Sequence, residues 1–138
     1  MEKDFEIIDH TADVGIVAYG ADIRQTFANA ARALFSLITE LDEVEEVIYR
    51  DIELKAPDQE SLLVDWLNEF IYLFDAENII FKRFDITELD DTRLKARSYG
   101  EKVDSSKHKL KTGVKAATYH MLKVDKGDKY KAQVLFDI

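Results

Sequence analysis

The residues of this chain that are best suited to chemistry are concentrated near its start. Two carboxylates, an imidazole and a hydroxyl fall within residues 9–13, as Asp9, His10, Thr11 and Asp13. The apolar segments on both sides are typical of strands, so this polar stretch is expected to form the turn between them. The turn therefore gathers several titratable groups where two strands meet.

A second acidic position lies at the other end of the sequence. Asp137 stands next to Ile138, so that a side-chain carboxylate and the free α-carboxylate are one residue apart. Together with Asp13 they would supply three hard oxygen ligands, a set that suits calcium, magnesium or manganese rather than zinc. Three negative groups repel one another unless a cation neutralises them. The pattern suggests one divalent-metal site, provided that the last strand ends beside the first strands.

Each of these residues also has an ordinary structural interpretation. Asp9 and Asp13 are common turn residues, whose carboxylates accept hydrogen bonds from nearby backbone N–H groups. Thr11 can bond within the same turn, and Gly15 can mark a bulge or a close backbone approach. His10 is more often a hydrogen-bonded structural imidazole than a base or a metal ligand. The residues alone leave both interpretations open.

A second unusual stretch covers residues 114–120. Alternate residues of an extended strand share a face, which puts Thr118 and His120 on one side and Lys115 and Tyr119 on the other. The neighbouring alanines leave room above the sheet, so Lys115 or His120 could contact a partner or a phosphate. The alternative is a satisfied cross-strand pair. Just before this stretch, residues 104–111 are rich in lysine and are expected to form an exposed basic loop.

The elements that position these residues follow from hydrophobic periodicity. Short apolar, β-branched runs predict strands at residues 5–8, 14–19, 47–56 (one or two strands), 79–81, 84–86, 94–99, 114–124 and 130–136. Apolar residues recur every three or four positions over residues 23–38 and 63–74, which predicts two helices with Asp22 and Asp58 as N-caps. This order predicts an α+β fold, with a mainly antiparallel sheet and two amphipathic helices packed against it.

Length and composition limit the classes of function. The 138 residues suit a single domain over residues 1–138. No apolar run approaches the roughly twenty residues that span a bilayer, and the start is too acidic for a signal peptide, so we expect a cytoplasmic protein with no membrane contact. The lack of cysteine removes disulfides and thiolate metal sites.

The charge balance bears on the partner. Nineteen basic against 28 acidic residues give a net charge of −9, which repels a phosphate backbone. This balance argues against direct RNA contact and favours a protein partner with a basic cleft, or a cation.

Four motifs in this order resemble those of the archease family, and the resemblance covers essentially the whole chain. They are residues 9–15 (DHTADVG), 63–69 (LVDWLNE), 115–120 (KAATYH) and 136–138 (FDI). The resemblance implies an accessory protein, not itself an enzyme, of the GTP-dependent RNA ligase that rejoins tRNA halves in tRNA splicing. Such proteins promote guanylylation of the ligase's active-site histidine and allow multiple turnover.

The resemblance also implies a metal site. The family's ligands carry over to Asp13, Asp137 and the carboxylate of Ile138, with calcium as the first candidate and magnesium or manganese as alternatives. Asp9 and His10 are not carried over as ligands and would serve as neighbours that orient the site. From their positions in the strand, Lys115 and His120 are candidates for contacts that orient the ligands or meet a partner.

Two other classes of protein stay open at this point. One is a small metal-dependent phosphoesterase, with Asp13 and Asp137 as ligands and His10 or His120 as a general acid. It has less support because the sequence holds no nucleophile elbow, phosphate-binding glycine loop or paired-histidine metal motif. The other is an interaction or chaperone-like module that binds no metal.

Overall fold

The computed structural model of the protein describes residues 3–10 and 13–138, apart from the side chain of His10. Thr11 and Ala12, which belong to the early motif, lie outside the described residues. The elements in chain order are β1 (Phe5–His10), β2 (Asp13–Gly20), α1 (Ile23–Ile38), the short 3-10 helix η1 (Leu41–Glu43), β3 (Ile48–Lys55), α2 (Gln59–Glu77), β4 (Ile79–Leu89), β5 (Arg93–Lys102), β6 (Ala116–Lys126) and β7 (Tyr130–Asp137).

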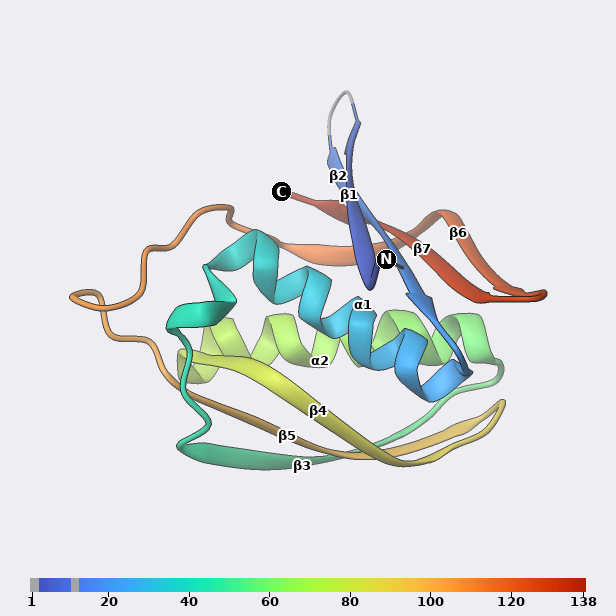
Figure 1. The fold of residues 1–138 in the computed structure, drawn as a ribbon, viewed down its shortest axis with the longest axis horizontal. Helices are drawn as coiled ribbons and strands as arrows, with labels where there is room; N and C mark the ends of the chain where they lie inside the picture. The colour runs from blue at the N-terminus through green and yellow to red at the C-terminus, as the bar shows by residue number, and fades with distance from the viewer. Residues whose placement is uncertain (1–2, 11–12) are drawn as a thin grey trace.

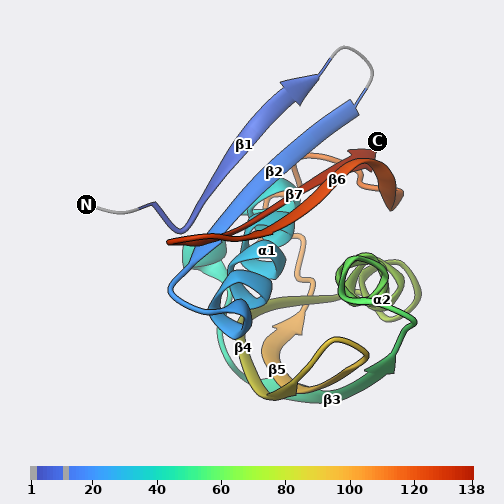
Figure 2. The ribbon, with the colours of Figure 1, turned by 90° about the vertical axis from the view of Figure 1, so that its right-hand side faces the viewer.

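The described strands form two antiparallel sheets with the helices between them. One sheet has the order β1-β2-β7-β6 and the other the order β3-β5-β4. Figures 1 and 2 show α1 and α2 as a middle layer, with one sheet on each side. The predicted α+β fold with two helices against antiparallel strands is confirmed, and the strands are divided between two sheets.

Both helices begin at the aspartates that the sequence predicts as N-caps. The Asp22 carboxylate accepts from the Gln25 N–H at 2.7 Å, and the Asp58 carboxylate accepts from the Ser61 N–H at 2.7 Å. Each cap satisfies a backbone donor that the first turn of a helix leaves unpaired. α2 ends at Asn78, whose φ of 56° is left-handed and suits an asparagine C-cap.

The core surrounds the two helices and includes residues of both sheets, and its aromatic cluster lies where the helices meet the three-stranded sheet. Trp66 and Phe70 of α2 pack edge to face at 4.5 Å between ring centroids, and Phe35 of α1 joins Phe70 at 5.7 Å. The Trp66 indole N–H donates to the Phe27 carbonyl at 2.9 Å, so this large ring is buried with its only donor satisfied. This core holds the helix layer on which the four-stranded sheet rests.

The outer face of the three-stranded sheet carries charges that pair with one another. Arg97 on the central strand β5 donates to Asp51 on β3 at 2.7 and 3.1 Å, and its guanidinium lies 4.1 Å from the ring centroid of Tyr49. Arg83 on β4 lies over the Tyr99 ring at 4.3 Å. Ion pairs and cation–π contacts thus connect the charged and aromatic side chains on this face.

One predicted pair of strands is a single strand in the structure, and the stretch predicted as one or two strands is also a single strand. Residues 79–81 and 84–86 both belong to β4, because a bulge between Phe81 and Arg83 shifts the register without ending the pairing with β5. Residues 47–56 give the single strand β3. The strand expected from residue 114 begins at Ala116. The residues before it bond elsewhere, since the Lys111 and Thr112 N–H groups donate to the Ile38 and Leu37 carbonyls.

Within the described residues, no helix has the length and apolar character needed to cross a membrane.

Candidate functional site at the end of the four-stranded sheet

The register of the four-stranded sheet brings the two acidic ends of the chain together. His10 of β1 pairs with Asp13 of β2, and Asp137 of β7 pairs with Ala116 of β6. Between them, Val14 pairs with Phe136, so the register continued by one residue sets Asp13 beside Asp137. We call the line His10, Asp13, Asp137 and Ala116 the end row. Both views show the C-terminus close to the start of β2 (Figures 1 and 2).

Lys115 is tied to the end row by its backbone. Its N–H donates to the Asp137 carbonyl at 2.8 Å, while its side chain is exposed. Asp137 and Ile138 are exposed as well, and Asp13 is partly buried. The carboxylates and one ammonium group therefore stand at the same end of the sheet.

The other candidate residues lie outside the end row. Asp9 pairs with Val14 and therefore stands one register step from Asp13. Opposite residues in an antiparallel pair share a face, so Asp9 lies on the same face as Val14. Its side chain is exposed. His120 lies in β6 beyond Thr118, where regular pairing with β7 stops, and its side chain is also exposed. The register thus brings Lys115 to the end row and places His120 further along β6.

Gly15 allows β2 and β7 to pack closely next to the site. A Cβ atom there would lie 2.5 Å from Leu135 Cδ2 and 3.3 Å from the Val134 carbonyl oxygen. The missing side chain lets Leu135 lie almost fully buried over β2. Of the two interpretations that the sequence leaves open for Gly15, the structure supports the close approach.

Asn68 of α2 fixes the edge of β6 just beyond the end row. Its side-chain oxygen accepts from the Ala117 N–H at 2.7 Å, and its amide donates to the Ala117 carbonyl at 3.4 Å. β6 is an edge strand, so these backbone groups would otherwise have no partner in the sheet. The sequence marks residues 63–69 as a family motif but does not reveal this role, because a lone asparagine on a helix carries no signal for it.

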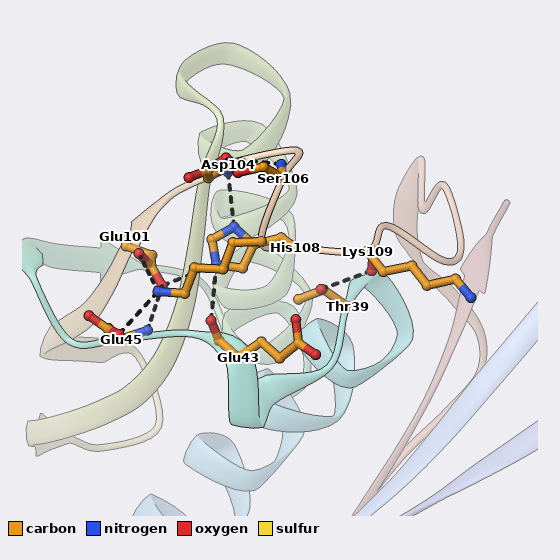
Figure 3. A network of polar contacts seen from close by, with 9 residues as sticks. Thr39, Glu43, Glu45, Glu101, Asp104, Ser106, His108 and Lys109 are labelled. Atoms are coloured by element: carbon orange, nitrogen blue, oxygen red, sulfur yellow. Dashed lines mark hydrogen bonds and ion pairs between the residues drawn. The ribbon is translucent and has the colours of Figure 1, made fainter.

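The segment expected to be an exposed basic loop is anchored by a buried histidine, and that expectation is wrong for His108. The His108 side chain has no exposed surface. Its Nδ1 accepts from the Asp104 N–H at 2.9 Å, and its Nε2 lies 3.1 Å from the Glu43 carbonyl oxygen and 3.0 Å from the Glu101 carboxylate (Figure 3). Because Nδ1 accepts a hydrogen bond, the ring proton lies on Nε2 and is shared by these two oxygens.

Ion pairs around His108 complete this anchor. Lys107 contacts the Glu101 carboxylate at 2.9 Å and the Glu45 carboxylate at 3.2 Å. Burial raises the pKa of Glu101, but hydrogen bonds from Lys107, the Glu45 N–H and His108 outweigh it and hold that pKa below the usual range. The hydrogen bond and charge of Glu101 raise the pKa of Lys107.

The anchored segment connects the end of α1 to the site. The Thr39 hydroxyl donates to the Lys109 carbonyl at 3.0 Å, and the Lys111 and Thr112 N–H groups donate to carbonyls of the last turn of α1. The chain then reaches Lys115 and the end row. The His108 contacts therefore help to fix where β6 starts.

The residues at the end row fit a hard divalent cation. Asp13 and Asp137 offer carboxylate oxygens from adjacent strands, and the α-carboxylate of Ile138 follows directly. Such donors suit calcium, magnesium or manganese. In the part of the chain that the structure describes, no three His, Cys, Asp or Glu side chains form a group that could hold a metal ion. The proposed third ligand is a backbone carboxylate.

The comparisons with known proteins agree over nearly the whole chain. The archease protein family (MTH1598/TM1083) matches residues 5–138. The protein archease of Methanosarcina mazei is 39% identical, over 99% of this chain and 97% of that protein, and that of Pyrococcus abyssi is 39% identical over 99% of both.

Solved structures agree in fold. The solution structure of Methanobacterium thermoautotrophicum protein 1598 has a TM-score of 0.84 and 37% identity, covering 98% of this chain and 99% of that one. The crystal structure of an archease, described as a possible chaperone, from Thermotoga maritima has a TM-score of 0.61 and covers 100% of this chain and 98% of that one; at 24% identity it supports the fold alone. The motifs, the fold and the relatives lead to one conclusion: this chain belongs to the archease family.

Proposed function

We propose that this protein is a cytoplasmic activator of the GTP-dependent RNA ligase of tRNA splicing. It would promote guanylylation of the ligase's active-site histidine and allow multiple turnover. The support for this proposal is membership of the archease family, together with the acidic end row that the sheet register assembles. The activator itself would catalyse no reaction.

The end row is the observation that carries the proposal. Asp13, Asp137 and the carboxylate of Ile138 would hold a divalent cation, with calcium as the first candidate. A bound cation neutralises charge on phosphate oxygens when a nucleophile attacks a nucleoside triphosphate. The pairing of β2 with β7 holds the two aspartates at one sheet end, and the Lys115 N–H keeps the Asp137 backbone in place. The residues of this chain thus position the ligand set at an exposed edge.

The charge of the protein suits a partner with a basic cleft. At a net charge of −9, the molecule is attracted to the positive surroundings of a nucleotide site and repelled by a free RNA backbone. The exposed side chains of Asp137 and Ile138 can enter such a cleft without rearrangement of the core. We therefore infer that the end row faces the ligase rather than RNA.

A guanylylation assay with the cognate ligase tests the proposal. Adding the wild-type protein should increase the guanylylated fraction of the ligase, and Asp13→Ala should abolish this stimulation because one ligand is lost. The matched control is Asp128→Asn, an exposed carboxylate in the β6–β7 turn at the other end of the sheet, which should stimulate like the wild type. A folded Asp13→Ala protein that stimulates fully would contradict the proposal.

The chain end gives a second arm of the same experiment. One glycine added after Ile138 moves the α-carboxylate away from Asp137, so this extension should also lose stimulation. Hydrolysis of a phosphoester by the purified protein alone would instead favour the independent phosphoesterase. Stimulation that depends on neither Asp13 nor the chain end would favour a chaperone-like module without metal.

A further inference from the structure

β6 contains a large irregularity a few residues beyond the end row. Thr118 pairs with Leu135, yet the next pair joins Lys123 to Gln133, so residues 119–122 stand against Val134 alone. We call residues 119–122 the β6 bulge. A bulge of this kind redirects side chains and is typical of strands next to functional sites. It also ends the face alternation expected from the sequence.

The backbone of the β6 bulge is strained. Met121 has a φ of 54°, in the left-handed region that favours glycine and asparagine. The Gln133 side-chain amide donates to the Met121 carbonyl at 3.0 Å and helps to hold this conformation. Strain of this type persists where surrounding contacts enforce it, and it is concentrated at ligand-binding and functional sites.

The strained conformation displays apolar side chains on the surface. Tyr119 is 58% exposed and Met121 is 49% exposed, although both belong to a strand that packs beside α2. Tyrosine is frequent among the residues that dominate binding energy, and methionine adapts to irregular apolar pockets.

The β6 bulge is continuous with the end row. Ala116 pairs with Asp137, and Tyr119 follows three residues later on the same strand, which corresponds to about 10 Å in extended conformation. The Asn68 contacts to Ala117 fix the backbone between the two features. A partner surface that contacts the end row would therefore also contact the β6 bulge.

The geometry points to Tyr119 and Met121 as the apolar anchors by which this protein binds the RNA ligase. This inference rests on the proposed function. The tyrosine ring and the thioether insert into an apolar pocket on the rim of the ligase cleft, and this contact directs the end row into the cleft. A protein partner is favoured over RNA because the chain carries a net charge of −9 and the displayed groups are apolar.

A titration of guanylylation separates docking from the chemistry of the end row. For Tyr119→Ala and Met121→Asn we expect the concentration for half-maximal stimulation to rise about tenfold or more, with an unchanged plateau, because anchors affect affinity. Asp13→Ala should lower the plateau instead. Asparagine tolerates the left-handed backbone, so Met121→Asn should melt at or above the wild-type temperature. The matched control is Tyr72→Ala, a tyrosine 61% exposed on α2, which should leave the titration unchanged.

Direct binding of the purified ligase to the same variants decides the inference even when guanylylation is not stimulated. Weaker binding of Tyr119→Ala and Met121→Asn, with wild-type binding of Tyr72→Ala, supports it. Equal binding of all variants overturns it while the proposed function stands, provided that the wild type stimulates. If Tyr119→Ala weakened binding to a single-stranded RNA but not to the ligase, Tyr119 would be assigned to base stacking. If the variant changed the mass of the protein in solution, Tyr119 would be assigned to self-association. Each result would overturn the inference.

Discussion

At the scale of single residues, partners from distant segments decide the roles that the sequence leaves open. Lys107 and His108 belong to a segment whose composition is typical of a solvated loop. His108 is buried because the Glu43 carbonyl, the Asp104 N–H and the Glu101 carboxylate satisfy both of its nitrogens. Two of these partners are backbone groups, which any residue type supplies, so sequence alone could not identify them.

The acidic residues of the end row, unlike the partners of His108, could be identified from the sequence. Asp13 and Asp137 could be singled out because carboxylates are concentrated at both ends of the chain, and the register sets them side by side. Asn68 could not be, since its role depends on lying beside the free edge of β6. Residue type thus allows candidate ligands to be predicted, but it does not identify the residues that hold the surrounding backbone in place.

The lowered pKa of Glu101 predicts a pH dependence of stability. The native state binds this proton less tightly than the unfolded chain, whose ordinary value is 4.5, so the stabilisation is present above that pH and is lost as the pH falls through the lower native pKa. Glu101→Gln should therefore reduce the slope of unfolding free energy against pH between about pH 5 and pH 3. Urea unfolding at a series of pH values measures this slope. Lys109→Gln, in the same segment, should keep the wild-type slope; equal slopes in Glu101→Gln and wild type would contradict the prediction.

At the scale of elements, features that depend on neighbouring residues could be predicted from the sequence. Features that depend on pairing between distant strands could not. Asp22 and Asp58 start their helices as expected, because N-cap chemistry involves only the next turn. β4 was predictable only as two pieces, since the bulge between Phe81 and Arg83 depends on pairing with β5. The division of the strands between two sheets likewise depends on which strands meet, and periodicity does not determine it.

Two glycines in strands should differ in their tolerance of substitution. A Cβ on Gly100 would lie 1.9 Å from the Ile80 carbonyl oxygen, which is backbone and paired, whereas a Cβ on Gly15 would meet the end of the Leu135 side chain. We expect Gly15→Ala to cost about 1–3 kcal/mol and Gly100→Ala to cost more than about 3 kcal/mol. Urea unfolding midpoints measure the difference. Similar losses for the two variants would show that β4 can move away from β5.

At the scale of the whole molecule, the site joins elements that are far apart in the sequence. The four-stranded sheet takes its strands from both ends of the chain, while the central residues build the helices and the second sheet. A ligand at the end row would contact both β2 and β7. Its binding would therefore stabilise the entire fold rather than one loop.

Calcium should accordingly raise the unfolding temperature of the whole protein. At a calcium concentration 100 times the dissociation constant, the native state gains about 2.7 kcal/mol, and a chelator should remove this gain. Asp13→Ala should melt at one temperature with calcium or chelator. Thermal unfolding followed by circular dichroism measures these shifts, and a wild-type midpoint that ignores both additions would exclude a calcium site at the end row.

The pairing of β2 with β7 also bears on how the protein is made in the cell. Residues 13–20 leave the ribosome long before residues 130–137. The edge of β2 that pairs with β7 therefore stays unpaired during most of translation. A nascent polypeptide at that stage exposes an incomplete sheet and carries only half of its acidic cluster. Asp13 and Asp137 can therefore lie side by side only after β7 has emerged, and prematurely terminated products would be prone to aggregate.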